Sequence, residues 1–164
     1  MRDPRVMQRR HFSLLIAFLL FAHDGLSQVP APSKAPVGVP PDATLFNGKW
    51  YRVFLEKGSW KLSREKCARL GGQLAVVHDT ATQAFIEELA KGLQLWLGAT
   101  DEKVEGLWIW VDGTPMSFKV WERNEPNNGS RREHYLQVGK NGPWNDGTNE
   151  AAYVVGFICE WKQR

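Results

Sequence analysis

The sequence contains few residues of the kinds that hold zinc, with two cysteines and four histidines among its 164 residues. The cysteines, Cys67 and Cys159, lie far apart in the sequence, and no histidines cluster beside them. A structural zinc site needs about four clustered ligands, so this composition argues against one. In an exported chain we expect the two cysteines to form a disulfide, and two free buried thiols are the alternative.

The chain also lacks a large excess of charge of one sign. Its 21 Lys and Arg residues and 18 Asp and Glu residues give a formal net charge of +3 at pH 7. Four of the arginines, Arg2, Arg5, Arg9 and Arg10, lie at the N-terminus, so the rest of the chain is close to neutral. Nucleic-acid binding relies on a strongly basic surface, and we therefore exclude nucleic acid as a partner.

No apolar run is long enough to cross a membrane as a helix, which takes about 20 residues. The longest run, residues 12–22, follows a basic start and precedes small residues at Gly25 and Ser27. These features predict a cleaved signal peptide over residues 1–27, with a buried helix or an N-terminal membrane anchor as the alternatives. We therefore expect a secreted, periplasmic or cell-surface protein without a stable membrane span after cleavage. Either Met1 or Met7 can be its start.

Heptad repeats are absent, so the sequence encodes no coiled-coil neck and does not indicate an oligomeric state. Residues 28–46 hold five of the nine prolines, a composition that predicts a stiff, extended linker. Residues 47–164 remain, enough for one globular domain.

Apolar periodicity predicts two helices and several short strands in this domain. The first helix begins at Ser59 and runs to Leu70, and the second begins with a capping box of Thr80 and Gln83. Strands are expected at residues 49–55, 73–77, 95–99, 107–111, 135–138 and 152–161. A polar segment, residues 121–133, has no apolar periodicity and is long for a loop, which is typical of functional or disordered segments.

Four short motifs in this order resemble those of the C-type lectin-like domain family. The resemblance covers about residues 47–162 and includes an acidic residue, Glu133, eight positions after Glu125. The matching segments are Trp96-Leu97-Gly98-Ala99 for the central WIGL-type strand, Glu125-Pro126-Asn127 for the EPN motif, Trp144-Asn145-Asp146 for the WND motif and Phe157-Ile158-Cys159-Glu160 for the closing strand.

The resemblance implies an α+β fold in which two helices flank small antiparallel sheets, with a long calcium- and sugar-binding loop. The family commonly has a second disulfide near that loop, whereas Tyr135 and Asn149 stand at about those positions here. This reduced set resembles the single-disulfide form of bacterial members. The EPN motif is that of the mannose-type subclass, and in the family the bond before the matching proline, Pro126 here, is cis.

The resemblance also implies a calcium site. Its ligands would be Glu125, Asn127, Glu133, Asn145 and Asp146, and their donors are all oxygen atoms, which favours a hard cation such as Ca²⁺. A second metal site, frequent in the family, would use Asp101, Glu105, Asn128 and Glu133. Asn128 and the nearby His134 stand where the family has carboxylates, and the alternative is that Asp101 and Glu105 are solvated turn residues.

The sugar-binding residues implied by the resemblance are Glu125, Asn127, Glu133 and Asn145. Each carboxylate accepts a hydrogen bond from a sugar hydroxyl and each amide donates one, while the calcium ion holds two vicinal hydroxyls. The expected partners are glycans of the mannose, N-acetylglucosamine or fucose type. No aromatic residue occurs at positions 128–130, where galactose-binding members often have one.

Two other functions compete with this interpretation. A calcium-stabilised module of the same fold could bind a protein or another surface without binding sugar, because a fold does not fix a function. A glycosidase would use two of the three carboxylates as its acid and base. The amide neighbours of those carboxylates and the lack of an extended cleft sequence argue against an enzyme.

Overall fold

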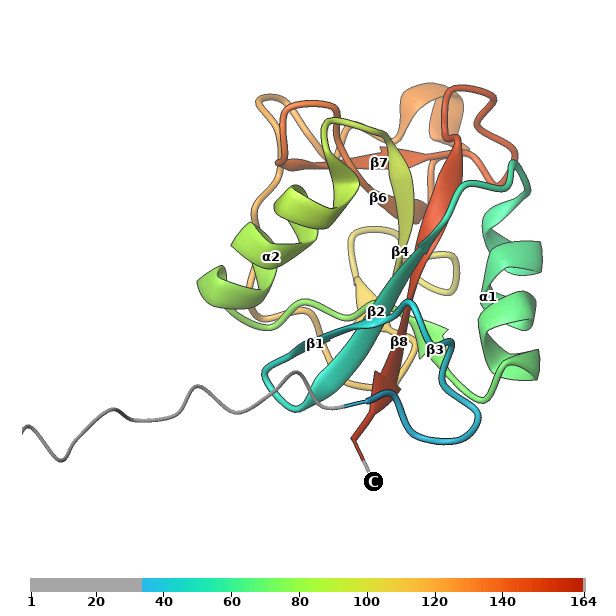
Figure 1. Cartoon of the computed structure of the whole chain (residues 1–164). Coiled ribbons are helices and arrows are strands. Elements are labelled where there is room, and N and C mark those ends of the chain that lie inside the picture. Colours follow the sequence, from blue (N-terminus) through green and yellow to red (C-terminus); the bar gives the residue numbers. More distant parts are fainter. Residues whose placement is uncertain (1–33, 164) are drawn as a thin grey trace, which may run out of the picture. The chain divides into compact units, whose positions relative to one another are not determined.

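The computed structural model describes residues 34–163, so the predicted signal peptide lies outside the described residues. The described residues form an α+β domain with two α-helices and eight strands (Figure 1). The elements are β1 (Thr44–Phe46), β2 (Lys49–Phe54), α1 (Trp60–Arg69), β3 (Gln73–Leu74), α2 (Thr80–Ala90), β4 (Leu95–Thr100), β5 (Ile109–Trp110), the 3-10 helix η1 (Gly129–Arg131), β6 (Tyr135–Val138), β7 (Trp144–Gly147) and β8 (Gly156–Lys162).

The two helices begin and end at local signals in the sequence. Ser59 caps α1 by accepting a hydrogen bond from the backbone N–H of Leu62, as predicted. The cap of α2 is Asp79, whose carboxylate accepts from the N–H of Thr82, so the prediction of Thr80 as the capping residue is wrong by one position. Within residues 34–163 no helix is long and apolar enough to cross a membrane.

The strands form one mixed sheet rather than the small antiparallel sheets that we expected. Their order is β1-β2-β8-β4-β6-β7, with β3 added to β8 and β5 added to β4. The pair β4–β8 is parallel and the other strand pairs are antiparallel. The two helices lie on either side of the central strands, and β6 and β7 gather at the end where η1 lies (Figure 1).

A disulfide between Cys67 and Cys159 joins α1 to β8, which confirms the predicted pairing. Both cysteines are fully buried beside Trp60 and Trp96. In small domains such a cross-link typically stabilises the fold by about 2–4 kcal/mol. It holds α1 against the sheet and leaves the end of the sheet that bears the loops without a cross-link of its own.

Part of the segment predicted as an extended linker is structured. Residues 44–46 form β1, which pairs with β2, and Ala43 is buried. The preceding residues make two turns, with hydrogen bonds from Val39 to Pro36 and from Ala43 to Pro40. The three prolines in the described part of this segment, Pro36, Pro40 and Pro41, therefore do not exclude packing, because turns can use proline as an extended linker does.

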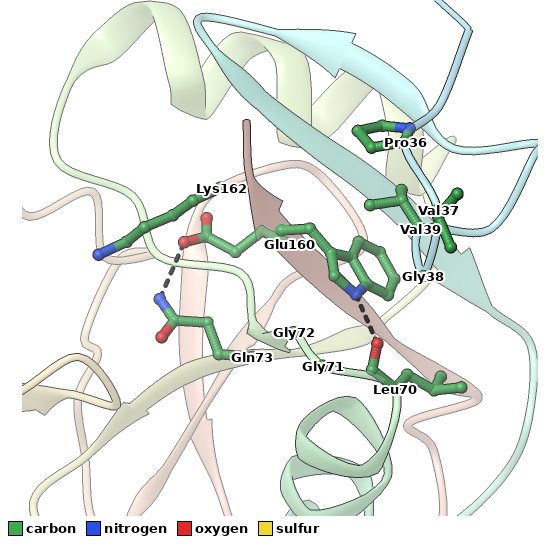
Figure 2. Close-up of a pocket in the computed structure, with 11 residues that line it drawn as sticks. Pro36, Val37, Gly38, Val39, Leu70, Gly71, Gly72, Gln73, Glu160 and Lys162 are labelled. Atoms are coloured by element: carbon green, nitrogen blue, oxygen red, sulfur yellow. Dashed lines mark hydrogen bonds between the residues drawn. The ribbon is translucent and has the colours of Figure 1, made fainter. Parts of the chain in front are cut away.

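These turns cover a hollow of about 320 Å³ at the end of the domain away from η1 (Figures 1 and 2). The buried carboxylate of Glu160 lines it and is fully paired: it accepts hydrogen bonds from Lys49, Gln73 and the N–H of Val76. None of the predicted calcium or sugar ligands lines this hollow, and we assign it no role in binding.

Among the glycines of the described residues, Gly156 has the least room for a side chain. A Cβ atom there would lie 2.1 Å from the carbonyl oxygen of Phe54. We expect Gly156→Ala to lower the free energy of unfolding by about 3 kcal/mol, the upper end for an overpacked site. Gly58→Ala is the control, since its nearest contact would be at 3.9 Å. Urea denaturation of both variants measures the difference, and equal midpoints would contradict the close packing.

Candidate functional site

The long loop before β6 is placed by a cluster of aromatic side chains around Trp144, the first residue of β7. Trp144 is fully buried, and its Nε1 donates to Oε1 of Gln83 on α2 at 2.7 Å. The rings of Trp110, Phe118 and Trp121 meet it edge to face. Trp144 thus anchors the strand that carries the next two residues.

Asp146 connects β7 to the loop. Its side chain is fully buried, and its two carboxylate oxygens accept hydrogen bonds from the backbone N–H groups of Asn127, at 3.2 Å, and Asn128, at 2.8 Å. Leu136 of β6 is its partner in the sheet register. Residues 18 and 19 positions apart in the sequence are therefore joined directly.

Glu125 lies beside this junction. The bond between Glu125 and Pro126 is cis, as the resemblance implies. The Glu125 carboxylate accepts from the N–H of Asn127 at 3.1 Å and from its Nδ2 at 2.8 Å. Burial, followed by the neighbouring carboxylate of Asp146, raises the pKa of Glu125 to about 7. Near neutral pH this residue is therefore easily protonated, which removes one of two close negative charges.

Glu133 closes the loop on the other side. Its Oε2 accepts from the N–H of Gly129 at 2.7 Å, while its own N–H donates to Oδ1 of Asn128 at 3.1 Å. A Cβ atom at Gly129 would lie 2.6 Å from this carboxylate and 3.2 Å from Oδ1 of Asn127. Glycine at position 129 therefore lets Glu133 and Asn127 approach the same turn.

The structure thus brings four of the five predicted calcium ligands to one turn of backbone: Glu125, Asn127, Glu133 and Asp146. The fifth, Asn145, is partly exposed in β7, opposite Gln137 of β6. Three carboxylates and two amides offer the oxygen atoms that calcium takes, at flexible geometry. The donor set therefore fits a calcium ion.

The residues predicted for a second metal site do not all converge. Asp101, Glu105 and His134 each offer one ligand atom, and these atoms lie within 4.8 Å of one another. Nδ2 of Asn128 donates to Glu105, so Asn128 is adjacent. The carboxylate of Glu133 instead bonds Gly129. Asp101 is buried and its oxygens contact His134, at 3.1 Å, and the N–H of Gly106, at 2.8 Å.

Two residues beside the site, His134 and Tyr153, were not predicted from the sequence to take part in it. No contact was predicted for His134, whose ring lies 3.1 Å from Asp101 and 3.5 Å from Glu105. Tyr153 follows β7 and is 46% exposed, while its hydroxyl accepts a hydrogen bond from Nε2 of buried Gln137 at 3.2 Å. Only the position of Tyr153 shortly after the WND motif could have indicated its place, because it belongs to no periodic pattern.

Comparisons with known proteins consistently identify one family. The model of the family described as "Lectin C-type domain" matches residues 56–161. The hepatic lectin of Gallus gallus is 34% identical over 117 residues, which are 70% of this chain and 56% of the relative. The C-type mannose receptor 2 of Homo sapiens is 32% identical over 147 residues, which are 85% of this chain and 10% of the relative. The chain spans 34–56% of the length of the first curated relatives it matches.

Several solved structures are similar to this chain in fold and sequence. The carbohydrate-recognition domain of the mouse scavenger receptor C-type lectin superposes with a TM-score of 0.70 at 27% identity, covering 77% of this chain and 98% of that one. The cow CD23 domain, determined in the presence of a GlcNAc2Man3 oligosaccharide, gives a TM-score of 0.71 at 27% identity, covering 76% and 95%. The herring type II antifreeze protein gives 0.69 at 28% identity, covering 77% and 100%.

The contact between Glu125 and Asp146 can be tested without any ligand. In metal-free buffer the Glu125 carboxyl should titrate near pH 7. Asp146→Asn removes the neighbouring negative charge, so we expect the pKa of Glu125 to fall, although burial will keep it above its ordinary value. NMR of carboxyl-labelled glutamate measures the midpoint. The control Asp112→Asn, at a carboxylate beside His78, should leave it unchanged. An identical midpoint in Asp146→Asn would refute the proximity.

Proposed function

The chain belongs to the C-type lectin domain family, and we propose that its carbohydrate-recognition domain binds mannose-type glycans through a calcium ion. The family is one of non-enzymatic binding proteins, and carbohydrates are its typical ligands. The proposed calcium ligands are Glu125, Asn127, Glu133, Asn145 and Asp146. The proposed glycans carry mannose, N-acetylglucosamine or fucose.

One observation carries this proposal. Two sequence segments that are distant from each other, Glu125–Asn127 and Asn145–Asp146, meet through the hydrogen bonds between Asp146 and the loop backbone. Only oxygen donors converge there, and three of them are carboxylates. Among residues 34–163, no lysine or arginine forms an ion pair with Glu125, Glu133 or Asp146. A divalent cation would supply the missing positive charge.

In this proposal, four of the five calcium ligands also bind the sugar. When bound, calcium supplies coordination positions for two vicinal hydroxyls of a pyranose. Glu125 and Asn127 form one pair of acceptor and donor, and Glu133 and Asn145 form the other, so each hydroxyl meets one group of each kind. The order of glutamate before asparagine in the EPN motif is the proposed basis for choosing mannose-type sugars.

A second function remains a candidate because of the structures that resemble this chain. Two type II antifreeze proteins, one of them described as calcium-independent, superpose with TM-scores of 0.69 and 0.68. These proteins share the fold with the carbohydrate-recognition domains above. A calcium-stabilised module that binds a protein or another surface is therefore the alternative. We also propose that the chain is exported, on the strength of its N-terminal sequence.

Calcium should stabilise the domain, and more so at alkaline pH. Extracellular modules bind calcium at about 10⁻⁴–10⁻³ M, so about 10 mM calcium should add roughly 1.4–2.7 kcal/mol. Calcium competes with protons for Glu125, whose pKa is about 7 in the metal-free protein. The rise in Tm should thus be smaller at pH 5.5 than at pH 8.

The measurement is differential scanning calorimetry with calcium and with EDTA at both pH values. The control is Glu88→Gln on the exposed face of α2, which should respond like the wild type. A wild type whose Tm is the same in calcium and EDTA at pH 8 would contradict the calcium site.

Exchanging the first hydrogen-bonding pair tests the sugar site. Glu125→Gln with Asn127→Asp keeps the oxygen ligands and the total charge, so calcium should still bind. The donor and acceptor pattern is reversed, and mannose affinity, expected at a Kd of about 1 mM in the wild type, should fall at least about tenfold. Galactose affinity should increase only slightly, because positions 128–130 contain no aromatic residue.

A matched control lies in the same loop. Glu122→Gln with Asn124→Asp makes the same two changes at the same spacing, and mannose binding should be retained. Isothermal titration in saturating calcium compares the three proteins. If the double variant at 125 and 127 keeps full mannose affinity, the hydrogen-bond mechanism is wrong. A wild type that holds calcium but binds neither sugar would favour the alternative function.

A further inference from the structure

A hollow of about 770 Å³ lies beside the proposed sugar site. One wall is formed by residues 129–135, which include η1, and the other by residues 148–150, which follow β7. Both segments lie at the same end of the domain in Figure 1. Glu133 lines the hollow and is also a proposed calcium and sugar ligand, so the two places share a wall. A group attached to a sugar at the calcium can therefore extend into this hollow.

Two adjacent arginines, Arg131 and Arg132, lie on the wall formed by η1. Both are exposed, and within residues 34–163 neither takes part in an ion pair. Several other basic residues of the domain do have acidic partners, such as Lys61 with Glu102 and Arg52 with Asp42. Two neighbouring positive charges without a counter-charge repel each other, and an anion between them would relieve that repulsion.

The backbone of the turn that carries Arg131 has an unusual conformation. Ser130 and Arg131 have φ values of 57° and 58°, in the left-handed region that costs energy for residues other than glycine. Hydrogen bonds from the N–H of Arg131 to the carbonyl of Asn128, at 2.8 Å, and from Arg132 to Gly129, at 3.3 Å, fix the turn. The loop thus maintains a strained turn at the position where it presents the two guanidinium groups.

Besides the two arginines, the lining of the hollow contains two acidic residues and one histidine. Glu133 is engaged with the N–H of Gly129 and with the proposed calcium. His134 also lines the hollow, and its ring contacts Asp101 and Glu105. Glu150 is the remaining acid of the lining, so two arginines face one free carboxylate. Thr148 and Asn149 add polar groups beside it.

We propose that this hollow is a second subsite, in which Arg131 and Arg132 bind a phosphate or sulfate ester carried by a glycan whose neutral sugar is held at the calcium. The planar guanidinium group suits the oxygen atoms of such an ester, because it can donate two parallel hydrogen bonds. The subsite rests on the proposed function, and it narrows the ligand from mannose-type glycans to their anionic esters.

The test compares charged and neutral ligands on the full chain. An array carries mannose and mannose disaccharides that are unsubstituted, phosphorylated or sulfated at each free position, and it is read in saturating calcium at low salt. We expect at least one ester to bind about tenfold more tightly than its neutral counterpart, equivalent to roughly 1.4 kcal/mol. About 0.5 M salt should reduce this preference, because exposed charges are screened.

Substitutions of the two arginines test whether the preference for esters arises in the hollow. Arg131→Gln with Arg132→Gln should abolish it while leaving the affinity for neutral mannose within about twofold, and the corresponding pair of lysine substitutions should retain only part of it, since lysine keeps the charge without the planar fork. The control Lys91→Gln with Lys140→Gln removes the same charge from exposed positions outside the hollow and should leave the preference intact.

The outcomes separate the two proposals. Neutral mannose that fails to bind in calcium contradicts the proposed function, whatever the esters do. Neutral mannose that binds while no ester binds more tightly overturns the subsite alone. A preference for esters that survives in the glutamine pair also overturns it, because the charge responsible would then lie elsewhere. The relative strength of the phosphate and sulfate series identifies which ester the subsite prefers.

Discussion

A single buried carboxylate, that of Asp146, joins the long loop to the sheet. It accepts hydrogen bonds from two consecutive backbone N–H groups, those of Asn127 and Asn128. The position of Asp146 depends in turn on Trp144, which is locked to α2 by its hydrogen bond to Gln83. Through this chain of contacts, a loop with little apolar content acquires a defined position. The remaining site residues are placed by their contacts with the same stretch of loop.

Much of the fold and of the site could be predicted because several signals agreed. Apolar periodicity marked both helices, and the cap at Ser59 is local enough to be recognised from sequence. The pairing of Cys67 with Cys159 followed from there being only two cysteines. Convergence of the loop and β7 could not have come from spacing alone. It was expected because the EPN and WND motifs resemble those of a known family.

The features that were missed depend on contacts between distant segments. Strand β1 is too short to show a pattern, and it forms because β2 offers an edge for pairing. The mixed sheet arises from the parallel pairing of β4 with β8, which no local signal encodes. The contact of His134 could not be predicted because its partner Asp101 is 33 positions away in the sequence. The cap at Asp79 was a choice between two adjacent residues that both favour helix starts.

The two places where the domain buries acidic groups differ in how their charge is balanced. Glu160 has Lys49 at 2.9 Å together with Gln73 and a backbone N–H, so its charge is compensated by the protein itself. At the loop, Asp146 is just as buried but meets only N–H groups, and Glu125 lies beside it with a raised pKa. Burying an uncompensated charge is costly. If these carboxylates served only to fold the loop, a lysine beside them could compensate their charge, as Lys49 does for Glu160. Among residues 34–163, the concentration of carboxylates without a basic partner supports the proposed cation site. On that proposal, the stability of the loop would depend on the bound cation.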